Sequence, residues 1–301
     1  MIRKVYLGLL KKCKFIDAEQ YVKIYYEYYF RKKLDLQNPI TFNEKIQWLK
    51  VFYRPKILNL LVDKYEVRNY VSKKVGDKFL SEVIQVADSS DQINFDDLPN
   101  RFVVKATHGC NFNLVVFDKK KLNFIKAKLR FNKWLSKNQY YRGGLEWAYK
   151  DIRPRLIVEG YMEESGKASL TDFKFYCFNG KPHYIQVDTD RGGKHCRHFY
   201  DLHWVLQPFT KGRFEVAKNT LPKPMGLSTM IENVEKLSHG FPFVRVDLYN
   251  IDGKIIFGEM TFYPGDGRQP FNPSEYDEKI GRMLRLPKIP KGKKYITEPF
   301  L

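Results

Sequence analysis

The sequence VRVDLYNIDGKIIFGEMTFYPG at residues 244–265 predicts a β-hairpin, because two alternating runs flank a short turn. Side chains two positions apart share one face of a strand, so Arg245 and Asp247 are expected to point the same way. On the partner strand, the residues expected to share a face are Phe257, Glu259 and Thr261. The hairpin therefore presents an arginine and two carboxylates to one side of a sheet.

Two carboxylates held close together have two interpretations. They repel each other unless a cation lies between them, and hard oxygen ligands suit Mg²⁺ bound together with phosphates. Alternatively, Arg245 neutralises Asp247 or Glu259 in an ordinary ion pair within the sheet. The hairpin alone leaves both interpretations open.

A second polar feature lies in the sequence FVVKATHGCN at residues 102–111. An apolar strand ends at Lys105, and the loop that follows contains His108, Gly109 and Asn111. A lysine beside backbone N–H groups that can approach anionic oxygens is typical of a phosphate-binding loop. The spacing matches neither the Walker A motif nor the dinucleotide-binding glycine motif. A strand that ends in a turn with a solvated lysine explains the same residues.

A third feature lies on two expected strands, at residues 156–162 and 172–178. The end of the first strand offers backbone donors and acceptors to a purine. On the second strand, Asp172 can accept hydrogen bonds from ribose hydroxyls and Lys174 can reach phosphate, although ordinary alternation explains them equally well. The candidate nucleotide-binding residues are Glu159, Gly160, Tyr161, Met162, Asp172 and Lys174.

A cationic cluster lies at residues 188–204. Its histidines and Cys196 lack the usual zinc spacing, so we favour a cationic rim that holds an acidic substrate or a phosphorylated intermediate. The alternative is a hairpin held by local ion pairs, since charge runs are often solvated. The candidate substrate-binding residues are Arg191, Lys194, His195 and Arg197.

Composition restricts the partners. The 301 residues are 43% apolar and 16% aromatic, enough for a folded core, and their net charge of +19 favours anionic partners. No apolar run reaches the roughly 18 to 20 residues of a membrane helix, and the run near the N-terminus is too short for a signal peptide. Because the four cysteines are widely spaced, we expect free thiols and a cytoplasmic protein.

The chain is expected to fold as α+β in three parts. Residues 1–55 have helical periodicity, residues 56–155 mix helices and strands, and residues 156–301 are mostly strands. The basic, aromatic N-terminal helix either contacts the inner face of the cell membrane or packs as an accessory helix. Helices are expected at residues 57–75, 122–135 and 228–238, and further strands at 113–117, 183–188, 244–249 and 254–262.

The order of these features resembles the ATP-grasp superfamily. The ordered features are Lys105 with its loop, the strand that carries Glu159, and the motifs Asp-x-Lys, Arg-x-Asp and Glu-x-Thr with Pro-Gly. In the D-alanine–D-alanine ligase branch of that superfamily, the closing motif is Arg-x-Asp followed by Glu-x-Asn and Pro-Gly. The chain is more similar still to the TupA-like ATP-grasp family of polysaccharide and teichuronopeptide biosynthesis. This resemblance covers about residues 39–270 and rests on TFNEKIQW at 41–48, DKYEVR at 63–68, KATHG at 105–109 and FGEMT at 257–261.

The resemblance implies an ATP-grasp fold, in which two α+β lobes enclose ATP behind a helical N-terminal segment. It implies Mg²⁺ on Asp247 and Glu259, and Thr261 takes the position at which the D-alanine–D-alanine ligases have the asparagine ligand. The residues it assigns to ATP are Lys105 and Lys174 at the phosphates, residues 159–162 at the adenine and Asp172 at the ribose.

We therefore expect an ATP- and Mg²⁺-dependent ligase that forms an amide through an acyl phosphate. Its expected substrates are an amine or amino acid and a sugar carboxylate, such as a uronic acid of an acidic bacterial surface glycan. Arg245, Lys174 and Arg191 are the expected catalytic residues. The alternatives are a sugar kinase, a glycosyltransferase and a basic module without enzymatic activity, and nucleic acid is not an expected partner.

Overall fold

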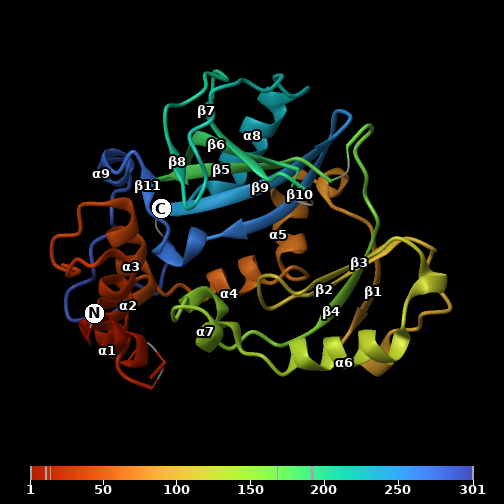
Figure 1. The fold of residues 1–301 in the computed structure, drawn as a ribbon, viewed down its shortest axis with the longest axis horizontal. Helices are drawn as coiled ribbons and strands as arrows, with labels where there is room; N and C mark the ends of the chain where they lie inside the picture. The colour runs from red at the N-terminus through yellow and green to blue at the C-terminus, as the bar shows by residue number, and fades with distance from the viewer. Residues whose placement is uncertain (1, 11, 14, 168, 191–192, 300–301) are drawn as a thin grey trace.

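The chain folds into two antiparallel sheets with a group of helices at one side (Figure 1). This computed structural model describes residues 2–10, 12–13, 15–167, 169–190 and 193–299. Its mixture of helices and antiparallel strands confirms the α+β class. Within the described residues, no helix combines the length and the apolar character needed to cross a membrane.

The smaller sheet and one helix form the lobe at the lower right of Figure 1. Helix α6 (Phe124–Leu135) packs Phe131 and Trp134 against the apolar face of this sheet. The strand order is β1-β4-β2-β3, with β1 at Val83–Ala87, β2 at Phe102–Ala106, β3 at Asn113–Val116 and β4 at Leu156–Gly160. Strand β4 thus pairs in the same sheet as β1, β2 and β3, although it follows residue 155 in the chain.

The larger sheet has the order β10-β9-β5-β6-β7 and positions most of the polar motifs. Its apolar face packs against helix α8 (Leu227–Ser238), while the opposite face carries Lys174, Arg245 and Asp247. This separation follows from strict alternation along the buried strands. The strands are β5 at Asp172–Phe178, β6 at Lys181–Thr189, β7 at Cys196–Asp201, β9 at Phe243–Ile251 and β10 at Lys254–Thr261.

A β-bulge at Gly258 changes the face of one expected residue. Glu259 pairs with Asp247, but Phe257 pairs with Leu248, so the register shifts by one residue between them. Phe257 is therefore turned to the apolar face and is buried in the core, and the expectation that it shares a face with Glu259 was wrong. Glycine is favoured at the bulge, since a Cβ there would lie 3.0 Å from the carbonyl oxygen of Asp247.

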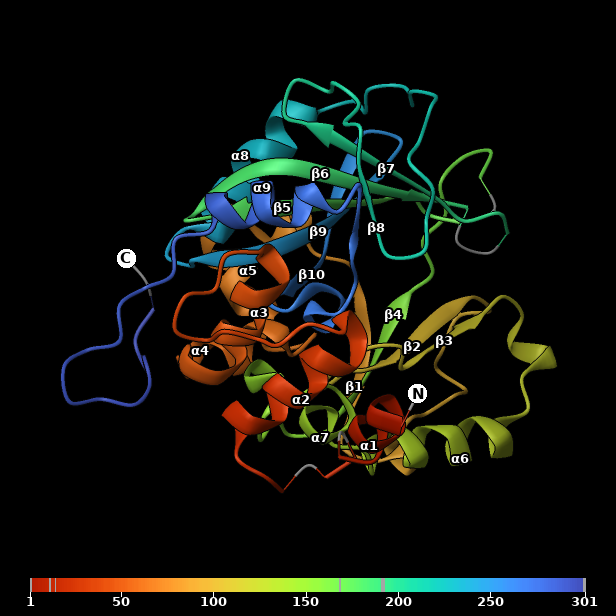
Figure 2. The same cartoon turned by 60° about the vertical axis from the view of Figure 1, so that its left-hand side comes forward.

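The N-terminal helices pack at the left of Figure 1, and Figure 2 shows the same helices brought forward. Helix α3 begins with the expected capping box between Thr41 and Glu44, and its Phe42 and Ile46 are fully buried in the main core. Tyr21 and Tyr25 of α2 are buried as well. Helices α2 and α3 of this part of the chain are thus an integral part of the core. Its helices are α1 at Ile2–Leu10, α2 at Ala18–Phe30 and α3 at Phe42–Phe52.

The expected single helix at residues 57–75 is wrong, because the chain breaks it at Asp63. The Asp63 side chain accepts hydrogen bonds from the backbone N–H groups of Tyr65 and Glu66, which starts a new turn. Helices α4 (Ile57–Val62) and α5 (Val67–Val75) result. Further elements without a sequence expectation are α7 at Gln139–Arg142, β8 at Thr210–Lys211, β11 at Phe271–Asn272 and α9 at Glu275–Met283.

Candidate active site

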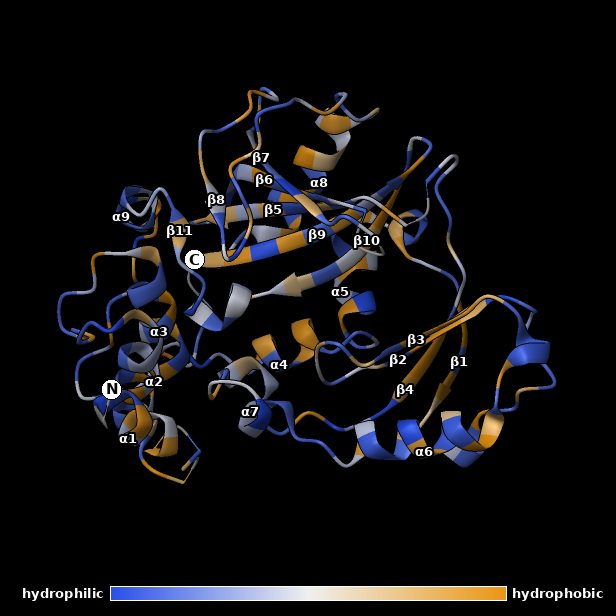
Figure 3. Ribbon diagram, viewed as in Figure 1, coloured by the Kyte–Doolittle hydropathy of each residue, from blue (hydrophilic) through white to orange (hydrophobic). Residues whose placement is uncertain are grey.

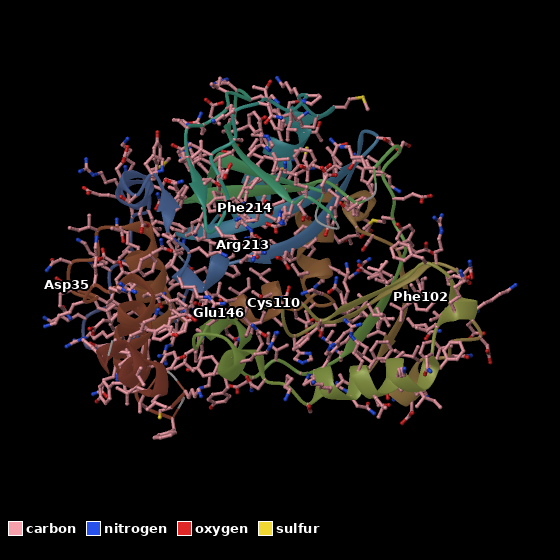
Figure 4. All side chains as sticks on the ribbon, in the orientation of Figure 1. Asp35, Phe102, Cys110, Glu146, Arg213 and Phe214 are labelled. Atoms are coloured by element: carbon pink, nitrogen blue, oxygen red, sulfur yellow. The ribbon has the colours of Figure 1, made fainter. Side chains whose placement is uncertain are left out.

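A cleft of about 390 Å³ lies between the polar face of the larger sheet and the loop that follows β2. Figure 4 labels Cys110 and Glu146 on one side of this region and Arg213 and Phe214 on the other. The cleft brings together many of the candidate residues from five strands and two loops. Those that line it are Lys105, Asn111, Asp172, Lys174, His195, Arg197, Arg245, Asp247 and Glu259.

The hairpin supplies a connected group of polar side chains on the wall formed by the larger sheet. The Arg245 guanidinium donates to both carboxylate oxygens of Asp247 at 2.6 Å and to Oε1 of Glu259 at 3.2 Å. Thr261 accepts a further hydrogen bond from Arg245 and donates to Glu259 at 3.1 Å. The ion pairs that the sequence left as an alternative are therefore present in the structure.

Lys174 extends this group along the neighbouring strand β5. Its ammonium nitrogen lies 3.0 Å from Asp247 and 3.3 Å from Asp172. Burial raises the pKa of Asp247, and the charges of Arg245 and Lys174 only partly offset that rise. The negative charge of the Asp247 carboxylate is thus stabilised by Arg245 and Lys174, which counter the effect of burial.

The second carboxylate, Glu259, has the opposite shift. Burial alone would raise its pKa, but the charges of Lys64, Arg245 and Lys174 outweigh burial and lower the pKa to about 2. Glu259 is therefore ionised at neutral pH and offers oxygen atoms to a cation at the wall of the cleft.

The residues of the hairpin fit a magnesium ion that is shared with phosphates. Among the described residues, no group of three or more histidine, cysteine or acidic side chains could hold a metal by itself. The donor set is instead two carboxylates and a hydroxyl, from Asp247, Glu259 and Thr261, all within one hydrogen-bonded group. Mg²⁺ commonly takes one or two carboxylates and completes its coordination with phosphate and water oxygens, so this donor set is sufficient.

Lys105 lies on the opposite wall, at the end of β2. Its ammonium nitrogen is 2.5 Å from Oε2 of Glu159 on the adjacent strand β4, and Ser81 donates a short hydrogen bond to the other oxygen. Burial opposes the ionisation of Glu159, but Lys105 and Ser81 together lower its pKa. Glu159 is thus an anionic partner that fixes Lys105 beside the cleft.

Lys64 connects the two walls, and its role was missed in the sequence. Its ammonium group donates to the carbonyl oxygen of Gly109 at 2.8 Å and lies 3.9 Å from Oε2 of Glu259. Next to it, Asp63 accepts a hydrogen bond from Thr107 at 3.1 Å. Two consecutive residues at the break between α4 and α5 therefore hold the loop after β2 against the cleft. The only signal in the sequence was the DKYEVR motif, which had no assigned chemistry.

Of the phosphate-binding residues expected in the loop after β2, only some line the cleft. Asn111 lines the cleft, with a positive φ of 60°, whereas the ring of His108 is buried and its Nε2 lies 3.1 Å from the carbonyl oxygen of Trp134. Burial lowers the pKa of His108. Gly109 leaves no room for a side chain, since a Cβ would lie 2.8 Å from the ring of Phe112. His108 and Gly109 thus support the conformation of the loop and do not line the cleft.

The expected cationic rim is only partly at the cleft. Arg197 and His195 line it, and the Arg197 guanidinium donates to both oxygens of Asp188 at 2.7 and 3.1 Å. The ring of Phe214 packs on Arg197 at 4.0 Å from its centroid to Cζ. Lys194 is exposed and does not line the cleft, and Arg191 lies outside the described residues.

The residues expected near adenine lie at the end of β4, beyond the polar cleft. The backbone N–H of Gly160 donates to the carbonyl oxygen of Glu82 at 3.2 Å, and the ring of Tyr161 packs against Phe117 with 5.5 Å between centroids. Met162 is half-buried. None of these three residues lines the cleft that holds the charged groups.

A buried charged cluster lies directly behind the cleft and was also missed. Lys50 of α3 forms an ion pair with Asp266, and Tyr25 of α2 donates a short hydrogen bond to the same carboxylate. Asp266 follows Gly265, which lines the cleft. Helices from the N-terminal segment therefore fix the turn that follows the candidate metal-binding hairpin.

Comparison with known proteins places these observations in a family. A family described as TupA-like ATP-grasp matches residues 44–285 of the chain. A search of curated proteins finds no match.

Similar solved structures include several ligases. The D-alanine–D-alanine ligase from Bacillus anthracis complexed with ATP is 16% identical with a TM-score of 0.39, and the match covers 73% of this chain and 61% of that one. The corresponding ligase from Helicobacter pylori is 16% identical with a TM-score of 0.42, and the match covers 84% and 69% of the two chains. A D-cycloserine synthetase is 14% identical with a TM-score of 0.40, and the match covers 76% of this chain and 72% of that one. The matched part of this chain thus spans about three fifths of the Bacillus anthracis ligase.

Proposed function

The chain belongs to the TupA-like ATP-grasp family, and from that premise we propose that it is an ATP- and Mg²⁺-dependent ligase that joins a carboxylate to an amine. The observation that carries this proposal is the cleft itself. Its walls place Lys174, Arg245, Asp247 and Glu259 opposite Lys105 and the loop after β2. A polar cleft with cations on both walls and two carboxylates on one suits a nucleoside triphosphate with its metal.

The proposed roles at the phosphates follow from position. Asp247, Glu259 and Thr261 would hold Mg²⁺, which when bound supplies positive charge to the phosphate oxygens. Lys105 and Lys174 would bind phosphate oxygens from the two walls, and Arg245 would stabilise negative charge that develops at the reacting carboxyl group. We further propose that the end of β4, at residues 159–162, and Asp172 serve the adenine and the ribose.

The proposed reaction has two displacements. An oxygen of the substrate carboxylate forms a bond to the γ-phosphorus of ATP while the bond from that phosphorus to its bridging oxygen breaks, and ADP leaves. The amine nitrogen then forms a bond to the carbonyl carbon, inorganic phosphate leaves, and the proton lost by the amine goes to solvent. Both steps need positioning and charge neutralisation more than a nucleophilic side chain, which agrees with the group of cations in the cleft.

For the acid, we propose a sugar carboxylate such as a uronic acid of a bacterial surface polysaccharide, and for the amine an amino acid. The net charge of +19 favours an acidic partner, and His195 and Arg197 line the cleft beside the proposed phosphate site. Arg197 is paired with Asp188, so an acidic substrate would have to share this guanidinium. Lys194 and Arg191 complete the proposed acid-binding set. We place the reaction in the cytoplasm, where ATP is available.

The test is an assay of ADP release over a matrix of acids and amines, with Mg²⁺ present. We expect ADP only when a uronic acid and an amine are both supplied, and an amide product by mass spectrometry. Asp247→Asn and Glu259→Gln should each lower turnover at least a hundredfold, because each removes a proposed metal ligand. Glu275→Gln, at an exposed carboxylate on α9, is the matched control and should keep full activity. Full activity in both cleft variants would refute the ligase proposal.

The ADP-release assay separates a sugar kinase from the ligase, and a thermal-shift measurement separates a glycosyltransferase. A sugar kinase would release ADP with a sugar and no amine. A glycosyltransferase would be stabilised against heat by a UDP-sugar or CMP-sugar and not by ATP with Mg²⁺, since a ligand raises the melting temperature only by binding the folded protein. Either outcome would replace the proposal.

A further inference from the structure

Helix α6 has two large apolar side chains that face away from the protein. Its buried side packs Ala127, Phe131 and Trp134 against the smaller sheet. At about 100° per residue, Ile125 and Leu129 lie about 160° around the helix from Ala127. Their exposed fractions are 75% and 64%. Figure 3 shows apolar and hydrophilic residues mixed along this helix.

Helix α1 repeats this arrangement. Leu7 is buried against α2, and Val5 and Leu9 stand two positions before and after it, about 160° around the helix. Their exposed fractions are 62% and 61%. Each helix therefore turns a pair of aliphatic side chains, one turn apart, toward solvent.

Both helices lie on the same side of the molecule. In Figures 1 and 2, α1 lies below α2 and α6 lies below the smaller sheet, both along the lower edge. The larger sheet, with Asp247 and Glu259, lies above this edge. A flat partner could touch both helices while leaving the larger sheet free.

The charged side chains of these helices are all basic, but several of them have partners: Arg3 pairs with Glu27, Lys4 lies over the ring of Tyr28, and Lys128 pairs with Asp91. Neither α1 nor α6 contains an acidic residue. On α6, Lys126 and Lys133 lie beside Leu129 on the outward side, and within the part of the chain that the structure describes neither has an ion-pair partner. Lysines that flank exposed aliphatic residues suit a surface that combines negative charge with a hydrocarbon layer.

We propose that α1 and α6 form a docking surface for an anionic lipid membrane. Val5, Leu9, Ile125 and Leu129 enter the boundary between head groups and acyl chains, and Lys126 and Lys133 of α6 contact the negative lipid head groups. Each helix alone buries too little apolar area for stable binding, so the two act together. This inference does not rest on the ligase proposal, because it uses no residue of the cleft.

The test is sedimentation of the 301-residue chain with vesicles of phosphatidylcholine, with or without 30% phosphatidylglycerol. The double variants are Val5→Glu with Leu9→Glu, and Ile125→Glu with Leu129→Glu. The matched control is Val205→Glu, an exposed aliphatic residue in the turn after β7 (57% exposed). Thermal unfolding of each variant verifies that the fold is intact, which we expect because the replaced side chains are exposed.

We expect the wild type to bind the anionic vesicles at least tenfold more tightly than the neutral ones, and added salt to weaken that binding. Each double variant should lose at least tenfold in partitioning, and Val205→Glu should not. Equal partitioning of the wild type and both double variants would overturn the proposal. So would a wild-type dimer in sedimentation velocity that both double variants dissociate, because the surface would then bind a second copy of the chain.

Discussion

The ammonium nitrogen of Lys64 lies 3.9 Å from Oε2 of Glu259, across the cleft from the hairpin that carries this carboxylate. The same nitrogen donates to the carbonyl oxygen of Gly109 at 2.8 Å. One side chain thus joins the loop proposed to bind phosphate to the carboxylate proposed to bind metal. The positive charge of Lys64 should therefore attract the phosphates of ATP and repel a Mg²⁺ ion at Glu259.

This relationship predicts opposite effects of Lys64→Met on ATP and on Mg²⁺. Without the charge, the KM for ATP should rise about tenfold, as expected when one charge-assisted contact of about 1.4 kcal/mol is lost. The Mg²⁺ concentration for half-maximal ADP release should not rise, because a competing cation has left Glu259. Steady-state kinetics at varied ATP and Mg²⁺ measure both quantities. Lys73→Met, at an exposed lysine on α5, is the control, and an unchanged KM for ATP in Lys64→Met would contradict the prediction.

The Lys105–Glu159 pair predicts that stability and nucleotide binding can be separated. Lys105→Met should raise the KM for ATP about tenfold and also lower the melting temperature, because it leaves Glu159 buried without its cation. The double variant Lys105→Met with Glu159→Gln should recover the melting temperature but not the affinity for ATP. Calorimetric unfolding and ATP titration test this. Recovery of both would mean that Lys105 serves only to neutralise Glu159.

Much of the fold was readable from the sequence because alternation and capping are local. The strands at residues 172–178 and 244–249 and the capping box at Thr41 are confirmed, and the order of the motifs identified the family. The bulge at Gly258 could not be read, because one inserted residue leaves the sequence pattern almost unchanged while it reverses the face of Phe257.

The candidate site was only partly readable, because several of its contacts join distant parts of the chain. Lys64 lies in a break between two helices, and its position near Glu259 depends on how the lobes pack. Lys50 and Asp266 are likewise brought together by the packing of α3 against the turn after β10. Periodicity assigns such residues to a helix or a turn, but it does not indicate their partners.

The ion pair between Lys50 and Asp266 predicts a large, non-additive effect on stability. The Lys50 side chain is fully buried, so Lys50→Met should leave Asp266 without its cation and cost about 3 to 5 kcal/mol of unfolding free energy. Adding Asp266→Asn should recover part of that loss, since asparagine tolerates the positive φ of 61°. Urea unfolding of the two single variants and the double variant gives the coupling energy. Additive losses in the double variant would show that the two charges act independently.

Glu146, beside this pair, predicts a specific pH dependence of stability. Burial, with the nearby charge of Asp266, raises its pKa from 4.5 to about 8, so the folded protein holds this proton more tightly than the unfolded chain does. The resulting stabilisation is complete below about pH 4.5 and is lost as the pH rises through 8. Glu146→Gln mimics the protonated form, so its stability relative to wild type should increase between pH 4.5 and 8. Each unit of pKa shift is worth about 1.4 kcal/mol, and the increase should exceed that amount. Urea unfolding of both proteins across this pH range measures it, and parallel pH profiles would show that Glu146 is ionised in the fold.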